Sequence, residues 1–379
     1  MNSYVNWIKL LFSFFLCSQL YAKEIKQLAV FEPIDTSDPW TSTHMKRDYT
    51  SAAEIALAHF KDTSPSFIPE IRYFFLDDTP LDQVHDAILK SQSLAMTGNV
   101  FIYQSLASSH FSRDNGITYI NPMCSGDFLF TNGFSKSLGT PAEREIKAVQ
   151  GFIDNNIKYS DIFILYRNNV GYDLYYKHRF KKLYPKAKLV GGLQHSDIDI
   201  SKIVSSKRPL VIVASQAHNM VNTINKIQKH NKEVIFFGTN QWGHVDDFFR
   251  PTLKDKQNIN MYAASDYMHV SQENIANLKS IFDLNISLKK AKKFRDDFKK
   301  RYQREPAAFG HLVYDSVMLS FMIMDNEHVK TRDSFLSALN NIEKYEGVTS
   351  NFIAIGGNIS KAGYLLKWKE NGFVPIEEF

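Results

Sequence analysis

The sequence predicts an α/β protein with two units of similar size in tandem. Segments with the composition of buried strands alternate with segments of helical period, and the alternation restarts after the loop at residues 139–141. Strands that alternate with helices predict parallel sheets covered on both faces. The chain has 379 residues, 44% hydrophobic and 13% aromatic, which is enough for a separate core in each unit.

The first unit is expected to begin with a short apolar strand, followed by a helix in which apolar residues recur at helical spacing. A second strand is closed by the turn residues Asp77, Asp78 and Pro80, and a second helix repeats the helical period. Two further strands, separated by a short helix, complete the unit. The expected strands cover residues 26–31, 71–76, 100–103 and 117–120, and the expected helices cover residues 45–60 and 82–95.

The second unit repeats this order. Its clearest buried strand is the unbroken apolar run from Leu210 to Ala214. The expected helices cover residues 142–155, 172–184 and 220–230, and the expected strands cover residues 161–166, 188–190, 210–214 and 233–237.

The first 22 residues have the pattern of a cleavable signal peptide. Lys9 precedes the apolar run 10–16, and Ala22 supplies the small residue that signal peptidase requires before the cut. The run is too short to span a bilayer, which takes about 20 residues. We expect an exported protein that begins at Lys23. A lipoprotein anchored at Cys17 is the less favoured alternative, because Leu16 is a poor residue before a lipidated cysteine.

Removal of the signal leaves Cys124 as the one cysteine, so no intramolecular disulfide is expected. The formal net charge of +5 is too mild to predict a nucleic-acid partner. The lysine-rich stretch 289–301 contains Asp296 and Asp297, and such mixed charges at helical spacing are typical of a solvated helix face.

The sequence lacks the local motifs of dinucleotide-binding, nucleotide-hydrolysing, zinc-protease and α/β-hydrolase enzymes. Its histidines are scattered, and His218, His230 and His244 are not spaced as metal ligands with a cysteine or carboxylate. We therefore expect no enzyme, no catalytic residue, no metal and no cofactor.

One stretch of the sequence carries a family resemblance. Residues 298–309, Phe-Lys-Lys-Arg-Tyr-Gln-Arg-Glu-Pro-Ala-Ala-Phe, continue into Val-Tyr-Asp-Ser-Val at 313–317. They resemble the F-x-x-R-Y-x-R-E-P … A-Y-D-A-V signature of type I periplasmic binding proteins, which include the leucine, isoleucine and valine receptors of ABC importers. Further similar segments follow the family's order over residues 24–376: Asp77 at the end of the second strand, Ile120-Asn121-Pro122, Gly171-Tyr172-Asp173, residues 345–349 and residues 368–373.

The resemblance implies two Rossmann-like lobes joined by three crossings of the chain, with a ligand held between them. We place the crossings near residues 135, 262 and 362. Lobe 1 then takes residues 23–135 and 262–361, and lobe 2 takes residues 136–261 and 362–379.

Loops at one edge of each sheet are the expected ligand site. Carboxyl ends of parallel strands and amino ends of the following helices converge there and present unpaired N–H groups, which favour an anionic group on the ligand. The candidate residues are Trp40, Tyr103, Gln104, Ser105, Cys124 and Ser125 from lobe 1, and Tyr172, Ser215, Gln216, Asn240, Gln241 and Trp242 from lobe 2.

Several of these residues have a structural alternative. Ser105 and Ser125 are equally typical of helix N-caps, and Cys124 has the features of an inert, small buried side chain. Gln241 and Trp242 stand where the family places a polar ligand contact, but loop packing would explain them as well. We expect the ring of Trp242 to face the cleft and to be exposed when the lobes are open.

Departures from the family pattern bear on the ligand. Family members that bind amino acids hold the ammonium with an acid and aromatic rings, whereas this chain has Asn240 or Gln241 in place of the acid and Val170 in place of a tyrosine. A buried ammonium without a counter-charge costs several kcal/mol. A neutral or anionic solute is therefore expected to bind better than leucine, isoleucine or valine.

The resulting hypothesis is a periplasmic solute-binding protein of an ABC importer, a monomer that binds a small polar solute and delivers it to an inner-membrane permease. The alternative is a periplasmic sensor or regulatory module that uses the same fold to bind a protein partner. A transport receptor needs a ligand that bridges both lobes. A partner-binding module does not.

Overall fold

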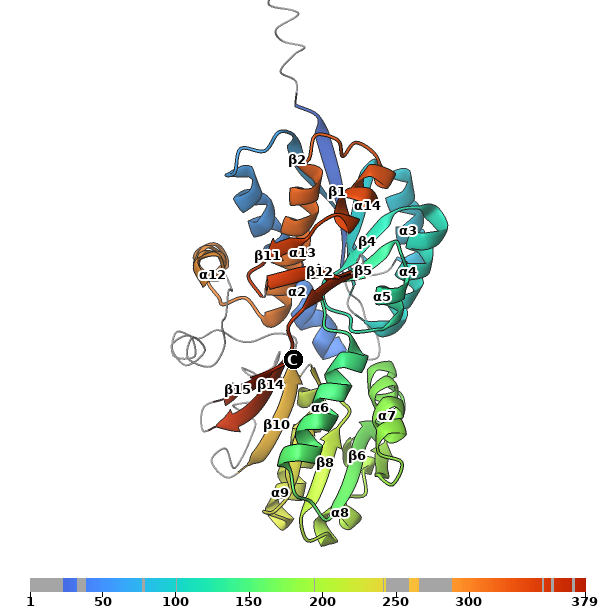
Figure 1. Cartoon of the computed structure of the whole chain (residues 1–379), viewed down its shortest axis with the longest axis vertical. Coiled ribbons are helices and arrows are strands. Elements are labelled where there is room, and N and C mark those ends of the chain that lie inside the picture. Colours follow the sequence, from blue (N-terminus) through green and yellow to red (C-terminus); the bar gives the residue numbers. More distant parts are fainter. Residues whose placement is uncertain are drawn as a thin grey trace, which may run out of the picture.

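The computed structural model describes residues 23–32, 39–76, 79–99, 101–193, 195–240, 242, 259–265, 288–349, 351–355, 358–369 and 372–379. These residues form two lobes, stacked along the long axis of the molecule (Figure 1). Each lobe is built on one sheet with helices on both faces, which confirms the predicted α/β class with two parallel-sheet units. No helix in these ranges is long and apolar enough to span a membrane.

Lobe 1 is built on a five-stranded parallel sheet, sheet A, with the strand order β2-β1-β3-β4-β5. Its strands are β1 (Ile25–Phe31), β2 (Ile68–Phe74), β3 (Ser93–Gly98), β4 (Thr118–Asn121) and β5 (Ser135–Ser137). The helices that cover it are α2 (Pro39–Lys61), α3 (Leu81–Lys90), α4 (Ile102–Asn115), α5 (Phe128–Thr131), α12 (Leu288–Tyr302), α13 (Ala308–Met324) and α14 (Arg332–Asn340).

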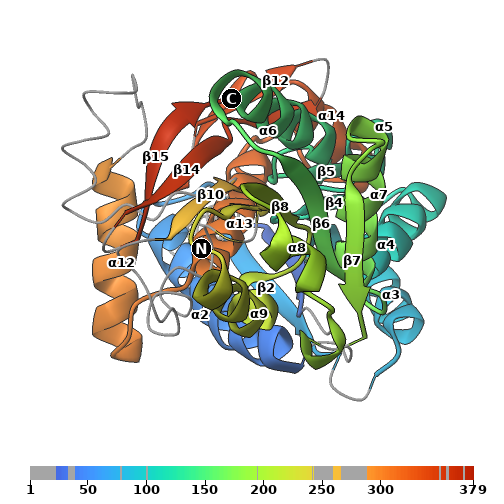
Figure 2. The ribbon, with the colours of Figure 1, turned by 90° about the horizontal axis from the view of Figure 1, so that it is seen from below.

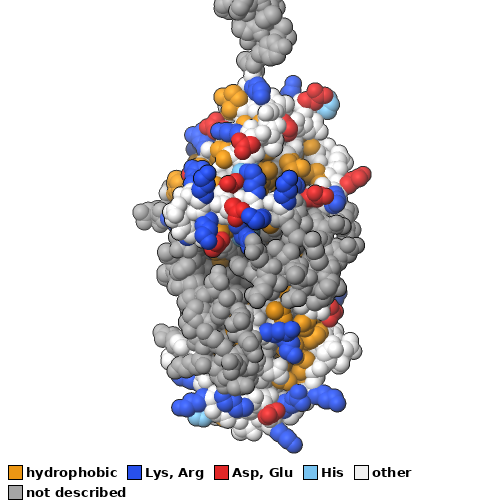
Figure 3. All heavy atoms as spheres, turned by 90° about the vertical axis from the view of Figure 1, so that its left-hand side faces the viewer, with side chains coloured by type: hydrophobic (Ala, Val, Ile, Leu, Met, Phe, Trp, Pro, Cys, Tyr) orange, Lys and Arg blue, Asp and Glu red, His pale blue; other side chains and the backbone are white. Residues whose placement is uncertain are grey.

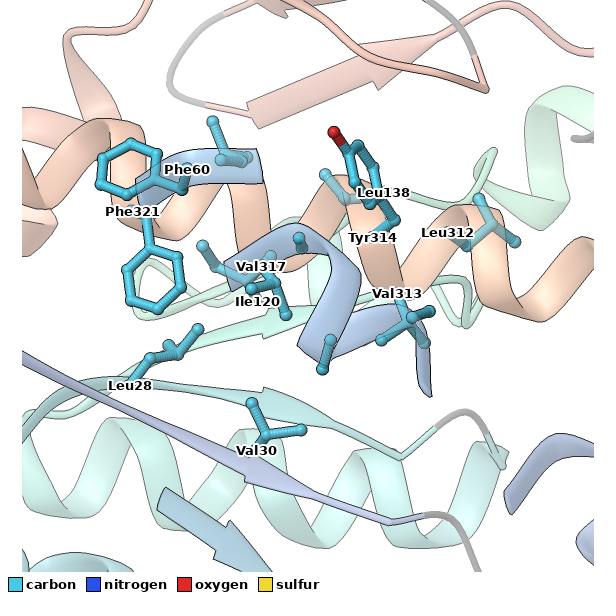
Figure 4. Close-up of a cluster of buried hydrophobic side chains, with 14 of the residues drawn as sticks. Leu28, Val30, Phe60, Ile120, Leu138, Leu312, Val313, Tyr314, Val317 and Phe321 are labelled. Carbon is cyan, nitrogen blue, oxygen red and sulfur yellow. The ribbon is translucent and has the colours of Figure 1, made fainter. Parts of the chain in front are cut away.

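The alternation of side chains along β1 explains why both faces of sheet A carry a core. Leu28 and Val30 pack on one side with residues of α2, α12 and α13, whereas Ala29 and Phe31 pack on the other side with residues of α3. Figure 4 shows the first of these cores, with Leu28 and Val30 below Phe60 and the side chains of α13.

The segment between β3 and α4 differs from the prediction. The expected helix to residue 95 ends at Lys90, and the strand expected at 100–103 lies at 93–98 instead. Tyr103, Gln104 and Ser105 are therefore in the first turns of α4 and not in a loop. The N-cap position of α4 is held by Phe101, so Ser105 is not a cap.

Lobe 2 is built on a seven-stranded sheet, sheet B, with the order β15-β14-β10-β9-β8-β6-β7. The strands from β10 to β7 are parallel, and β14 and β15 form an antiparallel extension. Its strands are β6 (Asp161–Arg167), β7 (Lys188–Gly192), β8 (Pro209–Val213), β9 (Ile235–Gly238), β10 (Asn260–Ser265), β14 (Tyr364–Lys369) and β15 (Gly372–Glu378).

Helices cover both faces of sheet B (Figure 2). One face packs against α6 (Ala142–Asn156) and α7 (Gly171–Leu183), and the other packs against α8 (Ser201–Ser205) and α9 (Ala217–His230). A short 3-10 helix, η1 (His195–Asp197), follows β7. The predicted elements of this lobe agree with the structure to within about three residues.

The chain passes from sheet A to sheet B between β5 and α6, and it leaves β10 of sheet B before returning to lobe 1 at α12. It then forms the small sheet C from β11 (Lys344–Glu346), β12 (Asn351–Ile355) and β13 (Asn358–Lys361) before it enters β14. Residues 135 and 262, near which two crossings were expected, lie inside strands β5 and β10, so the chain leaves sheet A after Ser137 and leaves sheet B after Ser265. Residue 362, near which the third was expected, lies between β13 and β14.

The segments that carry the family resemblance hold lobe 1 together. Arg304 forms an ion pair with the buried Asp48 of α2, whose carboxylate also accepts a hydrogen bond from the N–H of Ala307. Asp315 of α13 is buried and accepts hydrogen bonds from the N–H groups of Val348 and Thr349 at 2.8 and 3.0 Å. Burial raises the pKa of Asp315.

The lysine-rich helix α12 agrees with the expected solvated face. Lys292 and Lys293 form ion pairs with Asp296 and Asp297 one turn further on. Figure 3 shows this side of the molecule, where basic and acidic side chains are interspersed over the upper lobe.

Candidate ligand site between the lobes

Residues that follow the strands of sheet A meet residues that follow the strands of sheet B. The most direct contact joins Ser125, which follows β4, to Asn240, which follows β9. The Nδ2 group of Asn240 donates a hydrogen bond to the Oγ atom of Ser125 at 2.7 Å, and both residues are buried. The Ser125 carbonyl accepts a hydrogen bond from the N–H of Ala142, so this contact lies beside the first crossing.

The backbone N–H and the side-chain oxygen of Asn240 are held by lobe 2. Its N–H donates to Oε1 of Glu145 at 3.0 Å, and its Oδ1 lies 2.7 Å from the hydroxyl of Tyr172. The Tyr172 hydroxyl is also 2.7 Å from Oγ1 of Thr239. Asn240 is therefore fixed from three sides, and its amide nitrogen points to lobe 1.

Glu145 of α6 is a site residue that sequence reasoning missed. It is 1% exposed, and its Oε2 accepts a hydrogen bond from the hydroxyl of Tyr176 at 2.8 Å. Burial and the neighbouring Glu145 raise the pKa of Tyr176, which keeps the phenol neutral as a donor. The sequence signal was weak, because Glu143 and Glu145 together have the pattern of acidic residues at a helix start.

On the lobe 1 side, Asn121 organises the loop that follows β4. Its Oδ1 accepts hydrogen bonds from the N–H groups of Met123 and Cys124 at 2.9 and 2.6 Å, and its Nδ2 donates to Oγ of Ser105 at 3.0 Å. Ser105 is fully buried, whereas Tyr103 is 66% exposed. Ser105 thus supports the loop that presents Ser125.

Cys124 is buried beside these residues. Burial raises the pKa of its thiol to about 11, so the thiol stays protonated and unreactive at neutral pH. This environment agrees with the alternative that Cys124 is an inert, small buried side chain.

The edge of lobe 2 contains a buried ion pair. Asp173, in the first turn of α7, accepts hydrogen bonds from the N–H and Nε groups of Arg167 at 2.8 and 3.3 Å. Burial raises the pKa of Asp173 to about 6, although Arg167 and Ser215 act in the opposite direction. Ser215 and Gln216 follow β8 and are both buried. Ser215 lies beside Asp173, and Gln216 occupies the N-cap position of α9.

Trp242 has a different place from the expected one. Its ring is fully buried in the core of lobe 2, packs against Gly238, and donates a hydrogen bond from Nε1 to the carbonyl of Ser215 at 2.7 Å. This is the position that loop packing predicts, and the expected exposed ring at the cleft is not observed. Gln241 and the side chain of Trp40 lie outside the described residues.

By sequence, the chain matches no protein-family model and no curated protein. By structure, it is similar to the isoleucine-bound branched-chain amino acid transporter substrate-binding protein of Streptococcus pneumoniae, with a TM-score of 0.70, 14% identity, and coverage of 94% of this chain and 99% of the other. The fold is that of the type I periplasmic binding proteins.

Other solved proteins with this type I fold bind different solutes. The leucine-binding protein of Thermotoga maritima gives a TM-score of 0.68 at 15% identity, covering 93% of this chain and 98% of that protein. An ABC transporter solute-binding protein of R. palustris, solved with benzoate, gives a TM-score of 0.68 at 13% identity, covering 93% of this chain and 95% of that protein. The type I fold is therefore common to receptors for amino acids and for an aromatic acid.

Proposed function

We propose that the protein is an exported, periplasmic solute-binding protein that holds a small polar solute between its lobes and delivers it to an ABC permease. The observation that supports this most directly is the contact between Ser125 and Asn240. It brings polar side chains from the ends of both sheets together, as a ligand that bridges two lobes requires.

The charges around this contact favour a solute without an ammonium group. Among the described residues there, both carboxylate oxygens of Glu145 accept hydrogen bonds, from Asn240 and Tyr176, and Asp173 is paired with Arg167 through its Oδ2 atom. The first carboxylate is therefore not presented to an incoming cation, the charge of the second is balanced by the arginine, and the side chain that reaches across the lobes is the neutral amide of Asn240. The benzoate-bound receptor of the same fold holds an acid that has no ammonium group.

A thermal-shift measurement tests the proposal. The mature protein is unfolded, washed free of solute and refolded, and it is then heated with leucine, isoleucine, valine, benzoate and a panel of neutral and anionic solutes. A ligand at 100 times its Kd stabilises the folded state by about 2.7 kcal/mol. We expect no shift with the three amino acids and a shift of several degrees with at least one solute that lacks an amine.

Asn240→Ala and the control Lys182→Gln decide whether the shift arises at this site. Lys182 is an exposed residue of α7, so its variant should keep the shift that Asn240→Ala loses. Stabilisation by leucine at micromolar concentration would contradict the preference for a solute without an amine and would indicate an amino acid as the ligand.

The same contact also supports a second candidate function, a sensor that binds a protein partner. Ser125 and Asn240 satisfy each other directly, so the lobes can meet without a bridging solute. A solute panel that yields no stabilising compound would favour this second function.

A further inference from the structure

A group of three side chains joins the lobes on the flank where α5 of lobe 1 lies beside α7 of lobe 2 (Figures 1 and 2). Asp127 directly precedes α5. Its Oδ2 forms an ion pair with Nη2 of Arg179 and accepts a hydrogen bond from the hydroxyl of Tyr175 at 3.2 Å. The N–H of Asp127 lies 3.4 Å from the same hydroxyl. Asp127 therefore contacts lobe 2 through both its side chain and its backbone.

Tyr175 and Arg179 support each other one turn apart on α7. The guanidinium of Arg179 lies over the Tyr175 ring, 3.8 Å from its centroid, which holds the arginine in the orientation that meets Asp127. The side chains of Asp127 and Arg179 are each only 33% exposed, so solvent screens the pair incompletely. Isolated surface ion pairs contribute little, but a pair fixed by stacking and by a second hydrogen bond contributes more.

A second contact lies at the start of the same helix. The ring of Tyr103, from α4 of lobe 1, lies against Gly171, and a Cβ atom at Gly171 would be 2.2 Å from the ring. Lobe 1 thus touches α7 at its first residue and again two turns later, at Arg179. Separation of the lobes along this flank would break both contacts.

We propose that Asp127, Tyr175 and Arg179 form a latch that holds the lobes closed without a bound solute. Contacts made only in one of two conformations shift the equilibrium toward that conformation. The latch favours the closed state by its own free energy, whatever else lies between the lobes. A solute can then enter only while the lobes are open and the latch is broken. The association rate constant of the solute is therefore reduced in proportion to the fraction of protein in the open state.

The latch goes beyond the proposed function, because it concerns the equilibrium between open and closed lobes in solute-free protein. The test therefore measures that equilibrium without a solute. Fluorescent dyes are attached through Lys90→Cys in α3 and Lys202→Cys in α8, two exposed positions, one on each lobe. The native Cys124 is buried and labels slowly. Single-molecule energy transfer on protein that has been unfolded, washed and refolded reports the closed and open populations.

We expect the unaltered latch to give a mainly closed population, and Asp127→Asn or Arg179→Gln to lower the closed-to-open ratio by about tenfold. Lys182→Gln removes the same charge from an exposed site on α7 and should leave the ratio unchanged. The double variant should open no further than either single variant, because both remove one contact.

The exchanged pair Asp127→Arg with Arg179→Asp should recover part of the closed population, which separates a latch from general damage to the fold. A mainly open solute-free protein, or a ratio that Arg179→Gln leaves unchanged, would overturn the proposal. Neither result depends on which solute, if any, the protein carries.

Discussion

His59 connects three helices of lobe 1 through its two ring nitrogens. Nδ1 lies 2.9 Å from the hydroxyl of Tyr314 on α13, and Nε2 lies 2.8 Å from Oδ2 of Asp297 on α12. The carboxylate of Asp297 can only accept, so Nε2–H of the neutral ring donates to it, and Nδ1 accepts a hydrogen bond from the hydroxyl of Tyr314. Burial lowers the pKa of His59, with Lys293 acting in the same direction and Asp297 opposing.

The lowered pKa of His59 predicts a loss of stability in mild acid. The unfolded chain binds a proton near the ordinary value of 6.5, whereas the folded chain binds it only at lower pH. The contribution is therefore complete above pH 6.5 and is lost as the pH falls through the lowered value. Urea unfolding at pH 7.5 and 5.5 should show a larger loss for the native protein than for His59→Gln. Equal losses in the two proteins would contradict this.

Trp242 should behave as a core residue. Trp242→Ala removes a fully buried ring and leaves the Ser215 carbonyl without its donor, so we expect a loss of about 3–5 kcal/mol in the free energy of unfolding. Leu193→Ala removes an apolar side chain that is 61% exposed and serves as the control, with little change. An unchanged unfolding midpoint for Trp242→Ala would contradict the core position of this ring and favour the position at the cleft that the sequence predicted.

These residues show where sequence reasoning about the site stops. The positions of Ser125, Asn240 and Tyr172 after strands or at a helix start were enough to predict that they gather at one edge. The burial of Trp242 depends on a carbonyl 27 residues away, and the role of Glu145 depends on Tyr176 and Asn240. Such long-range partners leave no local pattern in the sequence.

At the scale of elements, β3 ends at a glycine that the fold requires. Gly98 has a φ of +153°, and a Cβ atom there would lie 2.1 Å from the carbonyl oxygen of Phe31 on the neighbouring strand. This close approach ends β3 and lets the apolar residues after it begin α4. The strand predicted at 100–103 was wrong for this reason, because an apolar run at a helix start has the same local pattern as a buried strand.

Gly98→Ala should therefore destabilise the protein by more than about 3 kcal/mol or prevent folding, because it combines backbone strain with a backbone clash. Gly151→Ala is the matched control. Gly151 lies inside α6 with open space around it, so alanine there should be neutral or stabilise by up to about 1 kcal/mol. Urea midpoints measure both. A Gly98→Ala protein of normal stability would show that this approach of the two strands is not required.

At the scale of the whole molecule, the alternation of strands and helices predicted two α/β units, whereas the three crossings of the chain between two lobes were implied by the family resemblance. In lobe 2, the elements from α6 to β9 were predicted to within about three residues. The clearest of these elements is β8, a continuous apolar run that allows few other interpretations. Sheet C and the hairpin of β14 and β15 were not predicted in the same detail. The strands of sheet C are only three to five residues long, and the hairpin joins sheet B through the pairing of β14 with the distant β10.

Export is a further expectation for the whole chain. Expressed with residues 1–22 in a host with signal peptidase, the protein should be recovered with Lys23 as its first residue, because Ala22 precedes the cut. The intact mass of the exported protein checks this. A lipid-modified chain that begins at Cys17 would contradict it.

The late strands of sheet B have a consequence for biogenesis. β10 pairs with β14 across about a hundred residues of sequence, through Tyr262 and Lys367, and β15 adds to that edge. During synthesis from the N-terminus, the edge of β10 stays open until α12, α13 and α14 have been made. Lobe 2 therefore passes through a stage with an unpaired strand that could join a second chain. We therefore expect a larger aggregated fraction when the protein is overproduced rapidly. Slower synthesis should lower that fraction.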